Sequence, residues 1–116
     1  MKIREHKLDD VTILELEGQL TKQGNVRFRE SAAAAIQDGA RKLILNLAQV
    51  EYIDGNGVGA LTACFITLRQ MNGRIKLLHP NDRVQRVLAI TKLINVFETF
   101  DSESAAIASY VDREEA

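Results

Sequence analysis

The sequence alternates short β-rich runs with stretches of helical periodicity, and this alternation limits the fold more than any other feature. Residues 2–8 and 11–18 come first, separated by the turn pair Asp9-Asp10, and predict a β-hairpin. Residues 43–47 form an apolar run of the kind found in a strand that is covered on both faces. Strands that alternate with helices predict a largely parallel sheet with right-handed crossovers, here with one antiparallel edge from the hairpin.

The spacing of apolar residues and the stop signals predict where the helices lie. Residues 25–40 carry apolar side chains at helical spacing and stop at Gly39, and the stretch from Val58 stops at Asn72-Gly73. Residues 74–80 and 96–100 are the remaining predicted strands. Asn81 or Asp82 is expected to cap a short helix after Pro80, and Asp101 a last helix over residues 102–111. The predicted order is β-β-α-β-α-β-α-β-α.

Length and composition favour one α/β domain over residues 1–116, with residues 112–116 as a frayed charged tail. The chain has 116 residues, is 46% hydrophobic and carries a formal charge of -1, so it has no overall attraction to nucleic acid or anionic lipid. We expect no membrane insertion, because no apolar segment approaches the roughly 20 residues of a membrane span. A signal peptide is also not evident, so the cytoplasm is the expected compartment.

The few residues that could carry metal or redox chemistry do not form a site. Cys64 is the only cysteine, and the two histidines are His6 and His79. These residues show no zinc-ligand spacing. Cys64 is expected to be a small buried apolar residue. We therefore expect no metal, no cofactor and no catalytic residues.

The stretch "VEYIDGNGVGAL", residues 50–61, is the leading candidate for a functional site. Three of the seven glycines, Gly55, Gly57 and Gly59, lie within five positions there. The stretch joins a buried strand to the start of a helix, and ligands of open α/β sheets tend to bind at the carboxyl ends of the strands.

Two ligand-binding interpretations of this turn have weak support. Gly55, Gly57 and Ala60 satisfy a relaxed dinucleotide-binding pattern. That pattern normally follows the first strand and needs an acidic residue at the end of the next one, where this chain has His79 and Pro80. A calcium loop would use Asp54 and Asn56, but it would place Val58 and Phe65 where oxygen ligands are needed.

A third interpretation rests on a family resemblance. The stretch "LILNLAQVEYIDGNGVGAL", the following helix "TACFITLRQMNG" and the strand "RIKLLHP" resemble the STAS domain of anti-sigma factor antagonists. "LELEGQLT" is similar to the Gly-Glu-Leu-Asp stretch of that family. The resemblance covers nearly the whole chain and implies the same α/β fold.

The resemblance also implies a function. Antagonists of this family bind an anti-sigma factor that is itself a serine kinase, and thereby free a sigma factor. Phosphorylation of the second serine in Asp-Ser-Ser-Gly-Leu/Val-Gly ends the binding. Asp54, Gly57, Val58 and Gly59 match this motif, whereas Gly55 and Asn56 stand in place of the two serines.

The loss of the phosphoacceptor at Asn56 predicts a module that does not switch at this position. The amide is neutral and resembles the unphosphorylated state, so we expect Asp54, Gly55, Asn56 and Gly57 to bind the partner, with Thr21 at the rim. Thr21 and Thr62 are the nearest hydroxyls that could serve as substitute phosphoacceptors.

Two alternatives stay open. The residues of the turn are also explained by structure alone, because Asp and Asn are favoured helix N-caps and glycine suits a tight strand-to-helix turn. A non-switching STAS subunit of a membrane transporter complex would also lack the serine. Assembly as a homodimer is compatible with either function.

Overall fold

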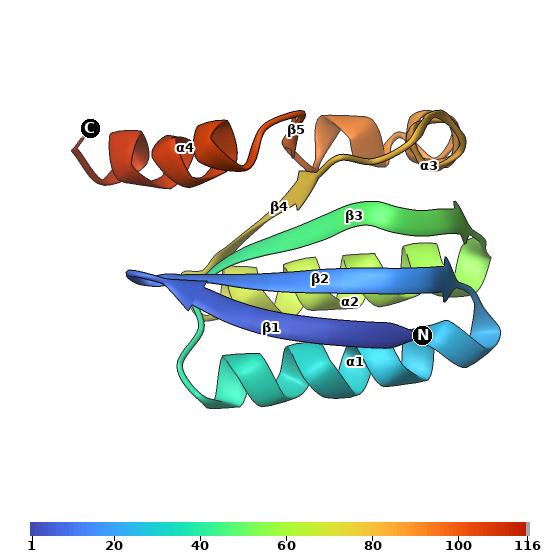
Figure 1. Ribbon diagram of the computed structural model, residues 1–116, viewed down its shortest axis with the longest axis horizontal. Coiled ribbons are helices and arrows are strands. Elements are labelled where there is room, and N and C mark those ends of the chain that lie inside the picture. Colours follow the sequence, from blue (N-terminus) through green and yellow to red (C-terminus); the bar gives the residue numbers. More distant parts are fainter. Residues whose placement is uncertain (116) are drawn as a thin grey trace.

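The computed structural model describes the backbone of residues 1–115 and the side chains of residues 1–111 as one five-stranded sheet with helices on both faces (Figure 1). The strand order is β1-β2-β3-β4-β5; β1 and β2 are antiparallel, and the other neighbouring pairs are parallel. The elements are β1 (Lys2–Leu8), β2 (Val11–Leu20), α1 (Lys22–Gln37), β3 (Lys42–Ile53), α2 (Gly55–Gln70), β4 (Arg74–Leu78), α3 (Asp82–Ile90), the 3-10 helix η1 (Leu93–Asn95), β5 (Thr99–Phe100) and α4 (Glu103–Glu115). The predicted fold class and order of elements are confirmed.

The register of the two central strands decides where the candidate site lies. β2 and β3 pair in parallel from Val11 opposite Lys42 to Leu20 opposite Ile53. Their carboxyl ends are therefore level, and α1 and α2 start side by side just beyond them (Figure 1). Residues that follow β2 and β3 in the sequence consequently meet at one edge of the sheet.

The two faces of the sheet are covered differently. Helices α1, α2 and α3 pack on the first face, where Phe28, Leu61 and Leu88 are fully buried together with side chains of β2 and β3. Helix α4 lies on the second face, where its Ala106 and Tyr110 form a smaller cluster with Val11, Ile13, Ile44 and Leu78. The apolar run of β3 thus supplies both faces, as predicted.

The last predicted strand is shorter than expected. Residues 96–100 were expected to form it, but only Thr99–Phe100 pair with β4. Phe97 turns into the first-face core and packs edge-on against Phe65, with ring centroids 5.5 Å apart. The backbone before β5 is used by a turn, since the N–H groups of Val96 and Phe97 donate to the Leu93 carbonyl at 2.9 and 3.0 Å and not to β4.

The helix ends differ from the predictions by a few residues. Helix α1 begins at Lys22, three residues before the predicted start, and α2 begins at Gly55 rather than at Val58. Asn81 caps α3, since its side chain accepts the Val84 N–H at 2.8 Å. In α4 the Ser102 hydroxyl, not Asp101, accepts the Ala105 N–H. Fraying of residues 112–116 stays a prediction: α4 continues to Glu115, and residue 116 lies outside the described residues.

Candidate functional site

The start of α2 is organised by the carboxylate of Asp54. Its Oδ1 accepts the N–H of Asn56 at 2.9 Å and the N–H of Gly57 at 3.1 Å. Asp54 itself has extended backbone angles, as an N-cap residue does. Two backbone donors that the helix cannot satisfy are thereby paired, so the turn holds one conformation without help from a ligand.

The glycines of the turn have different structural roles. A Cβ on Gly57 would lie 2.0 Å from the Leu20 carbonyl oxygen, so only glycine lets α2 start this close to the end of β2. A Cβ on Gly55 would meet no atom within 4 Å. In a dinucleotide-binding pattern, Gly57 would leave space for a pyrophosphate. Here the Leu20 carbonyl fills the space beside Gly57, which argues against that interpretation.

Asn56 is exposed at the N-terminal end of α2, one residue beyond the exposed Gly55. Its Nδ2 lies 3.5 Å from Asp54 Oδ2, a long contact that leaves the rest of the amide to solvent. A neutral, protruding side chain therefore stands where the partial positive charge of a helix start would favour an anion. The geometry fits recognition by another protein.

Thr21 lies next to a residue that contacts this turn. Thr21 follows Leu20, whose carbonyl accepts the Asp54 N–H at 3.3 Å, and its half-buried side chain makes no capping hydrogen bond to α1. Asn25 holds the adjacent backbone, because its Nδ2 donates to the carbonyls of Thr21 at 3.1 Å and Lys22 at 2.8 Å.

Thr62 lies farther from the exposed turn. Its hydroxyl donates to the Val58 carbonyl at 2.8 Å within α2, and the residue is half-buried. Six residues separate it from Asn56, which corresponds to about 9 Å along a helix axis. Of the two candidate hydroxyls, Thr21 is the one beside the turn.

Sequence reasoning missed a contact between Tyr52 and Arg83. Tyr52 is exposed two residues before Asp54, and the Arg83 guanidinium lies 5.1 Å from the centre of its ring. Asn81 joins α3 to the end of β3, since its Nδ2 donates to the carbonyls of Val50 at 3.1 Å and Glu51 at 3.2 Å. Strand alternation around the buried Ile53 could have indicated that Tyr52 faces outward, but not that Arg83 would stack on it.

The described residues give little support for a metal site or a reactive thiol at or near the turn. Within residues 1–111, no three His, Cys, Asp or Glu side chains are grouped to hold a metal ion. Asp54 already uses one carboxylate oxygen for two backbone donors. Cys64 is buried in α2, and burial raises the pKa of its thiol to about 11. The thiol is therefore protonated near neutral pH and is a poor nucleophile.

None of the described helices has both the length and the hydropathy that crossing a membrane requires.

Comparison with known proteins finds one family over nearly the whole chain. The family described as STAS domain matches residues 2–106. BtrV of Bordetella bronchiseptica, described as an anti-sigma factor antagonist, is 26% identical over 110 residues. The aligned residues make up 95% of this chain and 95% of BtrV. The anti-sigma-B factor antagonist of Staphylococcus aureus is 32% identical over 87 residues, 75% of this chain and 69% of the relative. A crystal structure described as an anti-sigma factor antagonist from Thermotoga maritima has a TM-score of 0.88 and 27% identity, with 92% of both chains covered.

Proposed function

The chain belongs to the STAS domain family, and on that premise we propose that it is a cytoplasmic regulatory module that binds an anti-sigma factor of the serine-kinase type. Its relatives are described as anti-sigma factor antagonists. By binding such a factor, the module would free a sigma factor. The proposed activity is binding, and no catalytic step is assigned to any residue.

The observation that carries the proposal is the exposed Asn56 at the start of α2. The capping by Asp54 presents Gly55 and Asn56 outward on a turn that is already ordered. A preordered turn loses little conformational entropy when a partner binds. Asp54, Gly55, Asn56 and Gly57 are therefore the proposed centre of the contact surface, with Thr21 at its rim.

We also propose that the module does not switch at Asn56. A phosphate would add about -1.5 to -2 charges at neutral pH. The start of α2 would tolerate that charge, because a helix N-terminus favours anions. The partner's surface, fitted to a small neutral side chain, would not. Asn56 has no hydroxyl to accept a phosphate, so the binding-competent state is permanent unless another residue is modified.

Thr21 is the better of the two substitute phosphoacceptors. It lies at the rim of the proposed surface, and its side chain does not cap α1. The hydroxyl of Thr62 is already used by the Val58 carbonyl. A phosphate on Thr21 would place negative charge against the same partner surface.

The test is affinity capture from the lysate of the source cell with wild type, Asn56→Glu and Gln70→Glu as baits. Gln70→Glu is the matched control, because it makes the same change of charge at an exposed site near the other end of α2. We expect wild type and Gln70→Glu to retain a kinase-like anti-sigma factor, and Asn56→Glu to bind it at least about tenfold more weakly, as a buried interfacial charge would require.

Other results would contradict the proposal. Equal retention by all three baits would remove the turn from the interface. Recovery of an ABC-type ATPase in place of an anti-sigma factor would favour the transporter-subunit alternative. Phosphate on the native protein, found by intact-mass measurement, would contradict a permanent binding-competent state, and peptide mapping that places it on Thr62 would contradict the choice of Thr21.

A further inference from the structure

The edge of the sheet beside β4 is only partly covered. The two residues of β5 pair with Leu77 and Leu78, while Arg74, Ile75 and Lys76 have no strand on that side within the described residues. The Leu77 N–H still finds a partner, since it donates to the Glu98 carbonyl at 3.0 Å. Three of the five residues of β4 therefore form an open strand edge.

The backbone of Ile75 faces this open edge. Arg74 donates its N–H to the Arg41 carbonyl at 2.7 Å on the side of β3, and Leu77 donates to the opposite side. Backbone groups of successive residues in a strand alternate between the two sides. Ile75 thus directs its N–H and C=O outward, and such an edge is a template on which another extended segment can pair.

A hollow of about 450 Å³ lies next to this edge. Its walls come from Phe65 and Arg69 of α2, from Arg74 and Ile75 of β4, and from Val96 and Glu98 before β5. The volume falls in the range of about 300–1,000 Å³ that is usual for ligand sites. Phe97 itself is buried in the first-face core, while its neighbours Val96 and Glu98 line the hollow.

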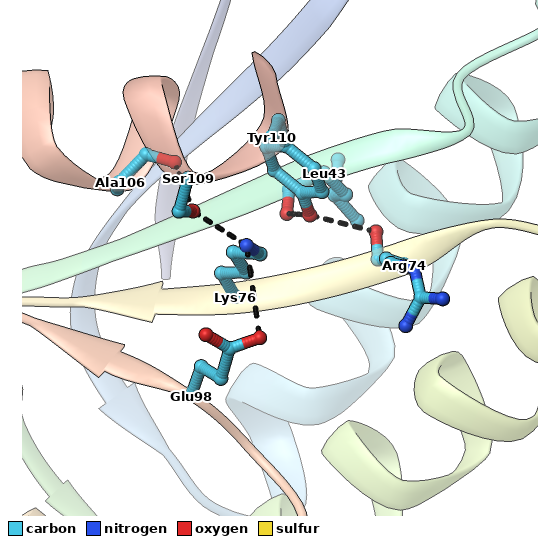
Figure 2. Close-up of polar contacts among 7 residues, drawn as sticks. All are labelled: Leu43, Arg74, Lys76, Glu98, Ala106, Ser109 and Tyr110. Atoms are coloured by element: carbon cyan, nitrogen blue, oxygen red, sulfur yellow. Dashed lines mark hydrogen bonds and ion pairs between the residues drawn. The ribbon is translucent and has the colours of Figure 1, made fainter. Parts of the chain in front are cut away.

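Two of the cations that line the hollow have no counter-ion in the part of the chain that the structure describes. The exposed Arg69 is placed against the Phe65 ring, 5.9 Å from its centroid, and the exposed Arg74 has no side-chain hydrogen bond or ion pair. A third cation, Lys76, lies 3.6 Å from the Glu98 carboxylate, and Figure 2 draws this ion pair. Among the described residues that line the hollow, cations therefore outnumber anions.

The two unpaired arginines lie on opposite sides of the sheet plane. Ile75 packs into the first-face core with α2, so its neighbour Arg74 projects toward the other face, because side chains alternate along a strand. Arg69 comes from α2 on the first face. An added strand also alternates its side chains, so its consecutive residues would reach the two arginines in turn.

From this geometry we propose that the open edge of β4 binds an extended acidic segment of a partner protein by strand addition. The backbone of the segment pairs with Ile75. Its carboxylates contact Arg69 and Arg74, and an apolar side chain fits against Phe65 and Val96. The site lies at the amino end of β4, far along the parallel sheet from the α2 turn, so this proposal does not depend on the proposed anti-sigma contact.

Charge complementarity favours an acidic segment over a second copy of the chain. The other edge of the sheet, β1, presents Lys2, Arg4 and Lys7 beside Glu5, and these cations would face Arg69 and Arg74. Like charges across a contact cost free energy. Charged side chains on edge strands also discourage unspecific pairing.

The test is a titration of ¹⁵N-labelled protein with the peptide acetyl-Glu-Glu-Val-Glu-Val-Glu-amide, followed by NMR. We expect saturable shifts at residues 73–76, a Kd below about 1 mM, and slower hydrogen exchange of the Ile75 amide. The same peptide with Gln in place of Glu should bind at least about tenfold more weakly. The double variant Arg69→Glu/Arg74→Glu should lose binding by a similar factor, whereas Arg27→Glu/Arg86→Glu, which reverses two exposed arginines elsewhere, should retain it.

Several outcomes would overturn strand addition. Sodium glutamate that produces the same shifts at the same carboxylate concentration would indicate a small-anion pocket only. Peptide binding without protection of the Ile75 amide would exclude backbone pairing. Shifts that depend on protein concentration without peptide would assign the edge to self-association, and an absence of saturable shifts would mean that the edge does not bind this class of segment.

Discussion

The two faces of the sheet are closed by different kinds of interaction. On the first face, three helices bury a continuous apolar core that includes Phe28. On the second face, the single helix α4 packs Ala106 and Tyr110 against four buried strand residues and is held by directional polar contacts (Figure 2). The Tyr110 hydroxyl lies 2.7 Å from the Leu43 carbonyl oxygen and 3.0 Å from that of Arg74, and Lys76 donates to the Ser109 hydroxyl. One face is stable through burial, whereas the other depends on a few hydrogen bonds in specific places.

The buried Lys76 is another residue whose polar contacts belong to the second face. It is 1% exposed, and its Nζ lies 4.3 Å from the centre of the Tyr110 ring and 5.5 Å from that of Phe100. A buried ammonium group is costly unless it is hydrogen-bonded and close to negative charge or to aromatic faces. The second face supplies these partners, so α4 is positioned by polar chemistry that an apolar core would not provide.

The largest expected effect concerns a matched pair of phenylalanines. Phe28→Ala should lower the free energy of unfolding by about 3–5 kcal/mol, because it leaves a cavity in the fully buried first-face core. Phe100→Ala removes a half-buried ring beside the second-face cluster and should cost less than about 2 kcal/mol. Urea denaturation measures both values. Equal losses would show that the two faces contribute alike.

The second prediction uses the thiol of the first face. Burial raises the pKa of Cys64 to about 11, and in the unfolded chain this pKa falls to its ordinary value near 9. The unfolded state therefore loses its proton first, so stability is complete below about pH 9 and falls as the pH rises toward 11. Between pH 8 and pH 10.5, the free energy of unfolding, measured by urea denaturation, should fall by about 2 kcal/mol more in wild type than in Cys64→Ala. Parallel pH profiles of the two proteins would refute burial of the thiol.

The smallest effect is expected from removal of one hydroxyl on the second face. Tyr110→Phe leaves the carbonyls of Leu43 and Arg74 without this donor and should cost about 1–2 kcal/mol. Hydrogen exchange should become faster in α4 while the amides of β3 stay protected, since local opening follows the weaker contacts. Tyr52→Phe, at an exposed ring, is the control and should change little. Uniform acceleration throughout the sheet would mean that α4 does not open separately.

Local signals in the sequence were sufficient to place the candidate turn. Asp54 was recognisable as a helix N-cap, and its two hydrogen bonds to the following N–H groups connect residues only two and three positions apart. The stop signal Asn72-Gly73, just beyond the end of α2 at Gln70, was also readable, because Asn72 has a φ of 62 degrees, a left-handed conformation that Asn tolerates. The start of α2 was predicted too late, since two glycines obscured the helical pattern of its first turn.

Other features depended on contacts between distant parts of the chain. The strand expected over residues 96–100 is limited to Thr99–Phe100, because a turn that donates the N–H groups of Val96 and Phe97 to the Leu93 carbonyl precedes it. Phe97 then packs on Phe65, more than thirty residues earlier. A lysine in the strand "RIKLLHP" would be expected at the surface. Lys76 is buried because α4 brings Ser109 and Tyr110 over it.

The amino-acid sequence by itself determined the order of strands and helices, the family and the identity of the exposed residue at the start of α2. These depend on periodicity, on helix caps and on motif spelling, all of which act over a few neighbouring residues. The tertiary structure decided that Gly57 must accommodate the Leu20 carbonyl, that Arg83 lies over the Tyr52 ring, and that part of the edge of β4 is left without a neighbouring strand among the described residues. Those outcomes depend on strand register and on competition for burial between side chains far apart in the chain, which no local pattern encodes.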